Sequence, residues 1–258
     1  MKKVKYIRCD ITNKNLLEKK INKKFDYVVN LGGYVDHSNK KKTLNSHYQG
    51  SKNLTEIFLK NRPMSFIQVG SSLEYGSSKS PQKESIKCNL KSIKSIYGKA
   101  KLLASMHMMN LFKKEKFPVT VIRFYLVYGP KQDVNRFLPI IITGCVKNKK
   151  FPCSTGEQLR DFIYVDDATD AIIKSLTNQN TKGQIINIGS GKPEKIKKVI
   201  EKVRKISKGG YPQYGMFKLR KFEIPKLYPN VKKAKNIINW KPKVSLEKGL
   251  RLTINSFK

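Results

Sequence analysis

The sequence predicts an α/β protein with a doubly wound parallel sheet, and two observations carry this prediction. Strand-like runs alternate with helical patterns through the first half of the chain, as in parallel strands joined by crossover helices. One of these runs, residues 25–31, is almost continuously apolar, as a strand covered on both faces must be. The chain has 258 residues, enough to bury a sizeable core in one domain or in two associated ones.

The predicted elements follow one another in a regular order. Strands are expected at residues 4–9, 25–31, 65–69 and 118–124. Long helices are expected at about 45–60 and 95–116. Two glycines after the second strand, Gly32 and Gly33, would let a ligand approach the backbone closely. After Pro130 the pattern changes to short mixed elements and a loop rich in Gly, Pro and Tyr at 209–215.

The net charge of +36 has two interpretations. Clustered basic residues bind nucleic acid by releasing counterions from phosphates, whereas a lysine-rich surface can simply be solvated. Only 8 of the 54 basic residues are arginine, the side chain that grips phosphates and bases in a bidentate way. The lysines are also spread along the whole chain. We therefore favour the solvated surface and do not expect nucleic acid as the partner.

Other function classes are excluded by what the sequence lacks. The four cysteines and three histidines show no metal-ligand spacing, so no metal site is expected. No apolar run is long enough to span a membrane, and the first residues lead into no signal-peptide core. We expect a cytoplasmic protein that does not interact with membranes.

Tyr97 and Lys101 form the pair that carries chemistry. They are four residues apart on the predicted helix 95–116 and so share one face. A neighbouring ammonium favours the phenolate, which makes the pair suitable as a general base and acid for a hydroxyl group. Hydroxyl side chains, Ser71 and Ser72, also follow the predicted strand 65–69, at the sheet edge where open α/β sheets bind ligands.

With these motifs the sequence resembles the extended short-chain dehydrogenase/reductase family of nucleotide-sugar epimerases and dehydratases. Eight segments carry the resemblance in order: CDITN, FDYVVNLGG, GSSLEYG, YGKAK, IRFYLVYGP, RDFIYVDD, NIGSGKP and WKPKVSLEKGL. The resemblance implies a Rossmann-like sheet, an NAD or NADP cofactor, a nucleotide-diphosphate sugar as substrate, and a homodimer.

The resemblance also implies roles for individual residues. Ser71, Tyr97 and Lys101 would be catalytic, with Lys101 also holding the nicotinamide ribose. The cofactor-binding residues implied are Asp10, Ile11, Leu31, Gly32, Gly33, Val69, Tyr97, Lys101 and Tyr125. The substrate-binding residues implied are Ser71, Ser72, Leu126, Arg160 and Arg220, the two arginines as clamps for the diphosphate. The alternative for Arg160 is an ion pair with Asp161 or Asp166. For Asp166 and Asp167 we favour helix capping.

Several positions depart from the family pattern. Leu126 and His47 stand where asparagine is usual, and the glycines at 32 and 33 stand where alanine is commoner. Ser72 and Leu73 replace the acidic pair with which sugar dehydratases eliminate water. Epimerisation or reduction is therefore favoured over dehydration.

The glycine-rich turn that holds the pyrophosphate in this fold does not occur before Asp10. We therefore expect the first strand–helix–strand unit to be missing, with residues 4–9 as the third strand of the usual order. Three explanations are open, in order of preference: a truncated form of a complete enzyme, an inactive remnant, or a chain completed by another polypeptide. On each of them the chain would bind the dinucleotide poorly.

The expected organisation follows from these observations. Residues 1–130 would form a truncated dinucleotide-binding domain, and residues 131–258 mostly a substrate-binding lobe, with a stretch near 183–190 returning to the sheet. The expected function is an NAD(P)-dependent nucleotide-sugar epimerase or reductase in polysaccharide or deoxysugar synthesis. The alternatives are a nucleotide-sugar dehydratase, a non-catalytic basic binding protein, and a catalytically inactive scaffold.

Overall fold

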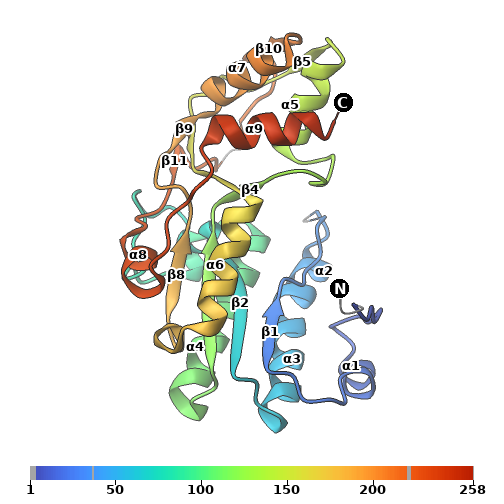
Figure 1. The fold of residues 1–258 in the computed structure, drawn as a ribbon, viewed down its shortest axis with the longest axis vertical. Helices are drawn as coiled ribbons and strands as arrows, with labels where there is room; N and C mark the ends of the chain where they lie inside the picture. The colour runs from blue at the N-terminus through green and yellow to red at the C-terminus, as the bar shows by residue number, and fades with distance from the viewer. Residues whose placement is uncertain (1–3, 37, 220–221, 258) are drawn as a thin grey trace. The chain divides into compact units, whose positions relative to one another are not determined.

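The computed structural model describes residues 4–36, 38–219 and 222–257, and they divide into two compact units (Figure 1). The first unit comprises Met1–Gly76, Lys87–Arg123 and Lys174–Ile186. The second comprises Ser77–Ile86, Phe124–Ile173 and Asn187–Lys258. None of the helices in the described part of the chain is both long and apolar enough to cross a bilayer.

A four-stranded sheet organises the first unit, and its order is β1-β2-β3-β8. The strands are β1 (Tyr27–Asn30), β2 (Ser65–Ser71), β3 (Val119–Phe124) and β8 (Ile185–Ile188), the last residues of β3 and β8 being assigned to the second unit. β1 and β2 pair in parallel, with Tyr27 opposite Ser65 and Asn30 opposite Gln68. β1 and β8 are the two edge strands of this sheet, and Figure 1 shows β1 at its edge.

Helices connect these strands. The helical elements of this unit are α1 (Lys14–Lys20), α2 (Lys40–Leu44), a π-helix (Asn45–Gln49), α3 (Gly50–Lys60), α4 (Ile96–Glu115) and short 3₁₀ turns at Ser72–Tyr75, Leu90–Ser92 and Gln179–Thr181. The single helix predicted at 45–60 is thus a π-helical turn followed by α3. α4 begins where expected because Ser95 caps it: the Ser95 hydroxyl accepts a hydrogen bond from the Gly98 N–H at 3.1 Å.

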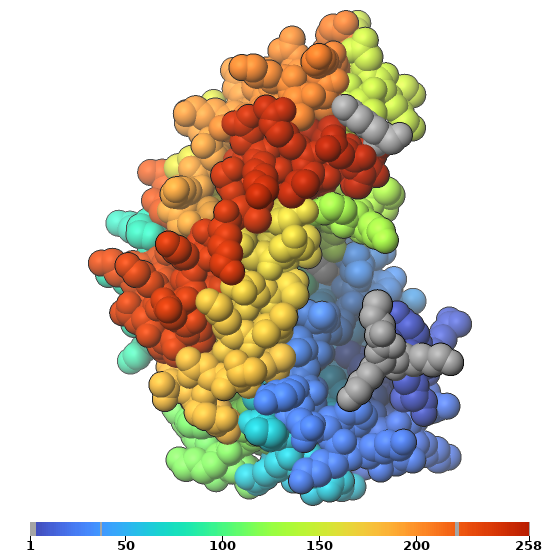
Figure 2. Space-filling view, viewed as in Figure 1, coloured from blue at the N-terminus to red at the C-terminus, as the bar shows by residue number. Residues whose placement is uncertain are grey.

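The strand predicted at residues 4–9 is wrong. These residues form no strand, and Tyr6 is 91% exposed. The dark-blue N-terminal residues lie on the surface of the face drawn in Figure 2. A strand is stable only with a hydrogen-bonded neighbour, and no strand of the described residues pairs with this segment.

The core of the first unit lies between the sheet and the helices α1, α3 and α4. Val119 and Val121 are two residues apart on β3 and so point to the same face. The other buried members of this cluster are Leu17, Leu54, Ile57, Phe58, Phe66, Met108 and Phe117. This packing fixes α4, and with it Tyr97 and Lys101, against β2.

The second unit consists of short strands and helices. Its elements are β4 (Leu126–Tyr128), α5 (Phe137–Val146), β5 (Lys150–Pro152), β6 (Leu159–Arg160), β7 (Phe162–Tyr164), α6 (Val165–Thr177, whose last turn belongs to the first unit), β9 (Glu194–Lys195), α7 (Ile196–Ser207), β10 (Tyr211–Gln213), β11 (Lys226–Leu227), α8 (Lys232–Ile238) and α9 (Leu246–Asn255). β4 pairs with β7 and β5 with β10, both in parallel, while β6 pairs in parallel with β11 and antiparallel with β9.

Aromatic side chains of β4 and β7 help to hold the second unit together. The Tyr128 ring packs edge-on against Phe162 and Tyr164, with ring centroids 6.2 and 5.7 Å away. Leucine, isoleucine and valine side chains of α5, α7 and α9 complete this core. Burial raises the pKa of Tyr128 well above its ordinary range, so its hydroxyl stays protonated.

Candidate active site

A tight turn presents the Ser71 hydroxyl at the carboxyl end of β2. Ser71 is buried and caps the 3₁₀ turn Ser72–Tyr75. Its Oγ accepts a hydrogen bond from the Leu73 N–H at 3.2 Å, and its own N–H donates to Glu74 Oε1 at 2.8 Å. This reciprocal arrangement is a capping box. Because Oγ acts as an acceptor within the turn, its hydrogen is left to donate to another group.

Glu74 and Arg123 form a fully buried ion pair behind this turn. Glu74 Oε2 lies 2.8 Å from Arg123 Nε, and the Arg123 guanidinium lies over the Tyr75 ring, 4.4 Å from its centroid. Burial lowers the pKa of Arg123, but Glu74, Tyr75 and Cys88 together raise that pKa by more, so the group stays charged. We did not predict this pair from the sequence. The signal was an arginine inside an apolar strand, since a buried arginine requires an acidic partner.

Tyr97 and Lys101 both lie on α4, one helical turn apart. The Lys101 ammonium lies 5.8 Å from the centroid of the Tyr97 ring and donates to the Val69 carbonyl at 2.8 Å. Lys101 is only 3% exposed. Burial lowers the pKa of Lys101 to about 8, and the attraction of Glu74 opposes part of this shift. The ammonium is therefore mostly charged at neutral pH, but close to its titration range.

A glycine brings the helix and the turn together. A Cβ atom at Gly98 would lie 2.9 Å from the Leu73 carbonyl oxygen, so only glycine lets α4 approach the turn so closely. The structure thus places the Ser71 turn, Tyr97 and Lys101 in one unit, around the carboxyl end of β2.

The end of β1 is shaped by internal hydrogen bonds and packing. The buried Asn30 amide donates to Ser51 Oγ at 3.1 Å and to Gln68 Oε1 at 2.9 Å, and its oxygen accepts from the Gly32 N–H at 3.0 Å. A Cβ atom at Gly32 would lie 2.9 Å from the Ile11 side chain. The absence of a side chain at Gly32 is thus explained by packing within the chain.

The Asp10 turn is tied to α3. Asp10 Oδ1 accepts from the Thr12 N–H at 2.8 Å and from the Thr12 hydroxyl at 2.9 Å. Asn53 on α3 donates to the carbonyls of Ile11 and Thr12 at 3.0 and 3.1 Å. Sequence reasoning missed Asn53, because it lies about 40 residues from the turn that it holds. Leu31, another predicted cofactor contact, is 65% exposed after β1.

The predicted residues after β3 belong to the second unit. The Tyr125 hydroxyl donates to Gln82 Oε1 at 2.7 Å, and both side chains are buried. Leu126 begins β4, donates its N–H to the Asp161 carbonyl at 3.0 Å, and is exposed. Ser72, in contrast, is buried in the first unit, within the turn that Ser71 caps.

Arg160 forms an ion pair, but with neither of the acids considered from the sequence. Its guanidinium donates to the Leu159 carbonyl at 2.8 Å and pairs with the Glu223 carboxylate. Burial lowers the pKa of Arg160, and Glu223 partly offsets this. Arg220, the second predicted anion clamp, lies outside the described residues.

Acidic side chains in the RDFIYVDD segment act as structural acceptors. Asp161 accepts from the Ser190 N–H at 2.6 Å and from its hydroxyl at 3.0 Å, and burial raises its pKa to about 6. Asp166 and Asp167 both lie inside the first turn of α6, which begins at Val165, and not in the cap positions before the helix that were expected. Asp167 accepts from the N–H groups of Lys243 and Val244, each at 2.9 Å, instead of capping its own helix.

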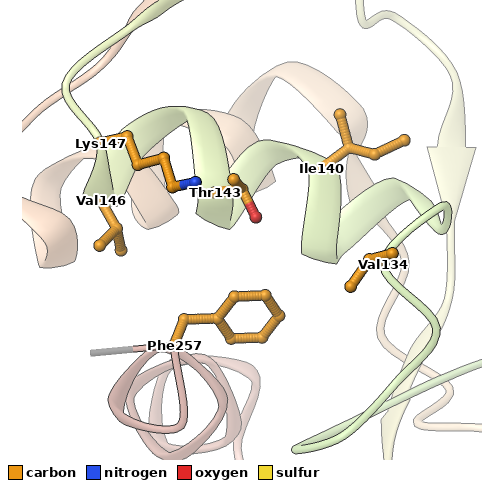
Figure 3. A pocket seen from close by; sticks show the side chains of 6 residues that line it. All are labelled: Val134, Ile140, Thr143, Val146, Lys147 and Phe257. Atoms are coloured by element: carbon orange, nitrogen blue, oxygen red, sulfur yellow. The ribbon is translucent and has the colours of Figure 1, made fainter.

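A separate pocket of about 450 Å³ lies in the second unit, where Phe257 faces α5 (Figure 3). Its lining residues are Val134, Ile140, Thr143, Val146, Lys147 and Phe257, none of which the sequence had suggested for the site. Among the residues that the structure describes, no group of three or more His, Cys, Asp or Glu side chains could hold a metal ion.

Known proteins resemble this chain along most of its length. A UDP-glucuronate 4-epimerase of Thermodesulfobacterium geofontis is 28% identical over 82% of this chain and 65% of its own length. A protein of Methanocaldococcus jannaschii is 29% identical over 64% of this chain and 53% of its own length. A UDP-N-acetyl-alpha-D-glucosaminuronate decarboxylase of Bacillus cytotoxicus is 25% identical over 98% of this chain and 82% of its own length. The chain thus spans less than two thirds of the first two relatives.

Solved structures show the same fold. Pal from Bacillus thuringiensis superposes with a TM-score of 0.89 at 27% identity, covering 97% of this chain and 82% of Pal. A UDP-glucose 4-epimerase of Thermotoga maritima, solved with UDP-glucose, superposes with a TM-score of 0.88 at 25% identity, covering 96% of this chain and 82% of the epimerase. The predicted Rossmann-like α/β fold is therefore confirmed. The model of one enzyme family also matches residues 1–189. The chain belongs to the NAD-dependent epimerase/dehydratase family.

Proposed function

We propose that this chain acts as an NAD(P)-dependent nucleotide-sugar epimerase or reductase, with Ser71, Tyr97 and Lys101 as its catalytic residues. The observation that carries the proposal is the buried Lys101 ammonium. It lies beside the Tyr97 ring and donates a hydrogen bond to the carbonyl of Val69, two residues before Ser71 on β2. Strongly shifted pKa values cluster at functional sites, so a buried lysine with a lowered pKa next to a tyrosine favours a catalytic role.

These side chains can move a proton at a sugar hydroxyl. The Lys101 ammonium favours the phenolate of Tyr97, which then accepts the hydroxyl proton as general base and returns it as general acid. The Ser71 hydroxyl donates a hydrogen bond to the same sugar oxygen and orients it. A nicotinamide dinucleotide supplies the hydride acceptor and donor when it is bound.

The residues of this chain fit part of that cofactor. Lys101 has three N–H donors, and the Val69 carbonyl takes one, so the others suit a ribose hydroxyl. The Asp10 turn is held in place by Asn53 and offers a carboxylate at the surface. The 258 residues contain no glycine-rich turn of the kind whose backbone donors hold a pyrophosphate in this fold. Asp10 and Lys101 would hold the two ends of the cofactor.

Relatives of this chain support a nucleotide sugar as the substrate. They carry the names of enzymes acting on UDP-glucuronate, UDP-glucose and a CDP-linked sugar. Arg160 would bind the diphosphate, and to do so it must exchange Glu223 for a phosphate oxygen. Ser72 and Leu73 offer no carboxyl group for eliminating water, which favours epimerisation or reduction. Such a reaction would serve polysaccharide or deoxysugar synthesis, in a cytoplasmic homodimer.

The first experiment measures cofactor binding. NAD⁺, NADH, NADP⁺ and NADPH are titrated into the 258-residue chain, and into a version extended in front of Met1 by a strand–helix–strand unit with the glycine-rich turn that is typical of this fold. We expect weak binding by the first and clear binding by the second. Tight binding by the 258-residue chain itself would show that no further unit is needed.

The second experiment measures turnover in whichever version binds the dinucleotide. UDP-glucose, UDP-glucuronate and CDP- and dTDP-4-keto sugars are supplied, and products are identified by NMR. Tyr97→Phe should lower kcat about 10²–10⁴-fold, the usual contribution of general acid–base catalysis. Lys113→Met, an exposed change on the same helix, is the control. A Tyr97→Phe variant with full turnover would refute the proposed role.

A further inference from the structure

The side chain of His47 lies against the Tyr97 ring. It is carried by the π-helical turn Asn45–Gln49, whose extra residue per turn sets it apart from the α-helices on either side. The two ring centroids are 5.0 Å apart and the ring planes make an angle of 79°. This is the edge-to-face geometry in which aromatic rings attract each other. The imidazole is buried, and its Nε2 lies 3.3 Å from the Tyr34 carbonyl oxygen.

Gly33 leaves the space that the imidazole occupies. A Cβ atom at residue 33 would lie 2.7 Å from Nε2 of His47 and closer still to its Cε1 and Nδ1. Real Cβ atoms do not approach other atoms so closely, so alanine at 33 and histidine at 47 cannot both keep their present positions. Gly33 also has a φ of +155°, which side-chain-bearing residues rarely adopt.

The position of Tyr97 at the start of α4 explains why its ring requires a neighbour that holds it in place. Tyr97 is the second residue of α4, two positions after the Ser95 cap, and its side chain is only partly buried. A phenol there can rotate about χ1 and χ2 unless another group blocks it. Two groups that contact the ring are the His47 imidazole and, 5.8 Å from the ring centroid, the Lys101 ammonium.

We propose that His47 is a positioning residue for Tyr97 and that Gly33 is its necessary complement. The glycine makes room for the imidazole, and the imidazole fixes the plane of the phenol so that its hydroxyl points in one direction. The catalytic meaning of this pairing rests on the function proposed above. The pairing itself is a property of the folded chain and can be measured without cofactor or substrate.

A double-mutant cycle tests the pairing. Gly33→Ala is made in the wild-type chain and in a His47→Ala background, and unfolding by urea gives the equilibrium constant for each. The backbone strain of alanine at 33 is present in both backgrounds and cancels in the cycle. We expect Gly33→Ala to reduce the folding equilibrium constant at least tenfold more in the wild type than in the His47→Ala background. An equal loss in both backgrounds would overturn the pairing.

A spectroscopic signature tests the positioning. 3-Fluorotyrosine is incorporated, and the fluorine resonance of Tyr97 is identified by its loss in Tyr97→Phe. His47→Asn should shift and broaden this resonance, whereas His47→Phe, which keeps an aromatic ring, should keep it closer to its original position. His107→Asn is the matched control, since His107 lies against Thr55 with Nε2 2.9 Å from its hydroxyl. An unchanged resonance in His47→Asn would overturn the positioning role.

Turnover distinguishes the two proposals. If the enzyme proves active, His47→Asn should lower kcat at least tenfold with little change in KM for the sugar, and His47→Phe should restore part of the loss. If the cycle and the fluorine shift turn out as expected but Tyr97→Phe keeps full activity, the positioning stands and the proposed function fails. If Tyr97→Phe loses activity but His47→Asn does not, the proposed function stands and the role of His47 in catalysis is overturned.

Discussion

At the scale of single residues, Glu74 connects the turn of Ser71 to the core. One of its carboxylate oxygens accepts the Ser71 N–H and the other pairs with Arg123. Removing one member of a buried ion pair leaves the other charged and without its partner, which costs more than the pair contributes. The position of the Ser71 hydroxyl therefore depends on an acid that itself has no part in the proposed chemistry.

Replacing Glu74 should destabilise the protein strongly. We expect Glu74→Ala to lower the free energy of unfolding by about 3–5 kcal/mol, because the Arg123 guanidinium is left buried beside a cavity. Glu74→Gln keeps an acceptor for the Ser71 N–H and should cost less. Urea unfolding followed by circular dichroism measures both. A loss below about 1 kcal/mol in Glu74→Ala would contradict this account of the pair.

Lys101 should make stability depend on pH in the alkaline range. Its pKa is about 8 in the folded chain and 10.5 as an ordinary lysine, so between these values the unfolded chain binds the proton more tightly. Relative to a Lys101→Met variant, the wild type should therefore gain stability as the pH rises from about 8 to 10.5, by up to about 3 kcal/mol. Below pH 8 the difference should be constant.

Unfolding free energies of both proteins at pH 7, 8, 9 and 10 measure this effect. A matched variant at the exposed Lys113 should follow the wild-type profile. If the difference between wild type and Lys101→Met stays flat across the range, Lys101 is not desolvated as its burial indicates.

Individual residues differed in how far the sequence could reveal them. Tyr97 and Lys101 could be placed on one helix because helix periodicity is local. Glu74 and Arg123, or Asn53 and the Asp10 turn, are pairs 40 to 50 positions apart, and only tertiary folding brings them together. The Glu223 partner of Arg160 was missed for the same reason.

At the scale of elements, the start of α4 sets the position of Tyr97. The Ser95 hydroxyl caps the helix, and Gly98 lets the first turn approach the Leu73 carbonyl. The first N–H groups of a helix have no acceptor within the helix, so the Ser95 hydroxyl provides an acceptor that the Gly98 N–H would otherwise lack.

Removing this cap should loosen the first turn of α4. We expect Ser95→Ala to lower the free energy of unfolding by about 1 kcal/mol, and Ser95→Asp to retain most of the stability, since aspartate is an equally good cap. Thermal unfolding of the two variants gives the comparison. Equal losses in both would mean that the hydroxyl cap does not stabilise this helix end.

Elements were predictable where their cause was local. The strands at 25–31, 65–69 and 118–124 and the helix at 95–116 were found close to their true bounds, because apolar runs and a cap mark them. The segment 4–9 alternates like a strand but forms none, since pairing depends on a neighbour that periodicity does not reveal. The π-helical turn was invisible because a 3.6-residue period fits the α-helices on both sides of it.

At the scale of the whole molecule, the net charge of +36 is the dominant physical fact. So many like charges repel one another and favour the expanded chain over the compact one. Most ion pairs of the described residues are exposed and contribute little. The exceptions are the Glu74–Arg123 pair, which is fully buried, and the Arg160–Glu223 pair, in which the arginine is buried.

Salt should therefore stabilise the protein. Raising sodium chloride from 0.01 M to 1 M shortens the Debye length from about 30 Å to about 3 Å and screens most of this repulsion. We expect the midpoint of thermal unfolding to rise over this range, measured at constant pH. Potassium chloride should give the same curve, since screening depends on ionic strength. A midpoint that falls with salt would mean that screened attractions outweigh the repulsion.

Salt should also affect association between molecules, through the edge strand β1. Among the described residues β1 pairs with β2 alone, and Tyr27 at its start and Leu31 directly after it are exposed. An uncovered edge can pair with the edge of another molecule, and positive charge keeps two such molecules apart. Added salt removes that barrier at the same time as it stabilises each molecule. The ionic strength at which the protein associates least should thus be lower than the ionic strength at which its midpoint of thermal unfolding is highest.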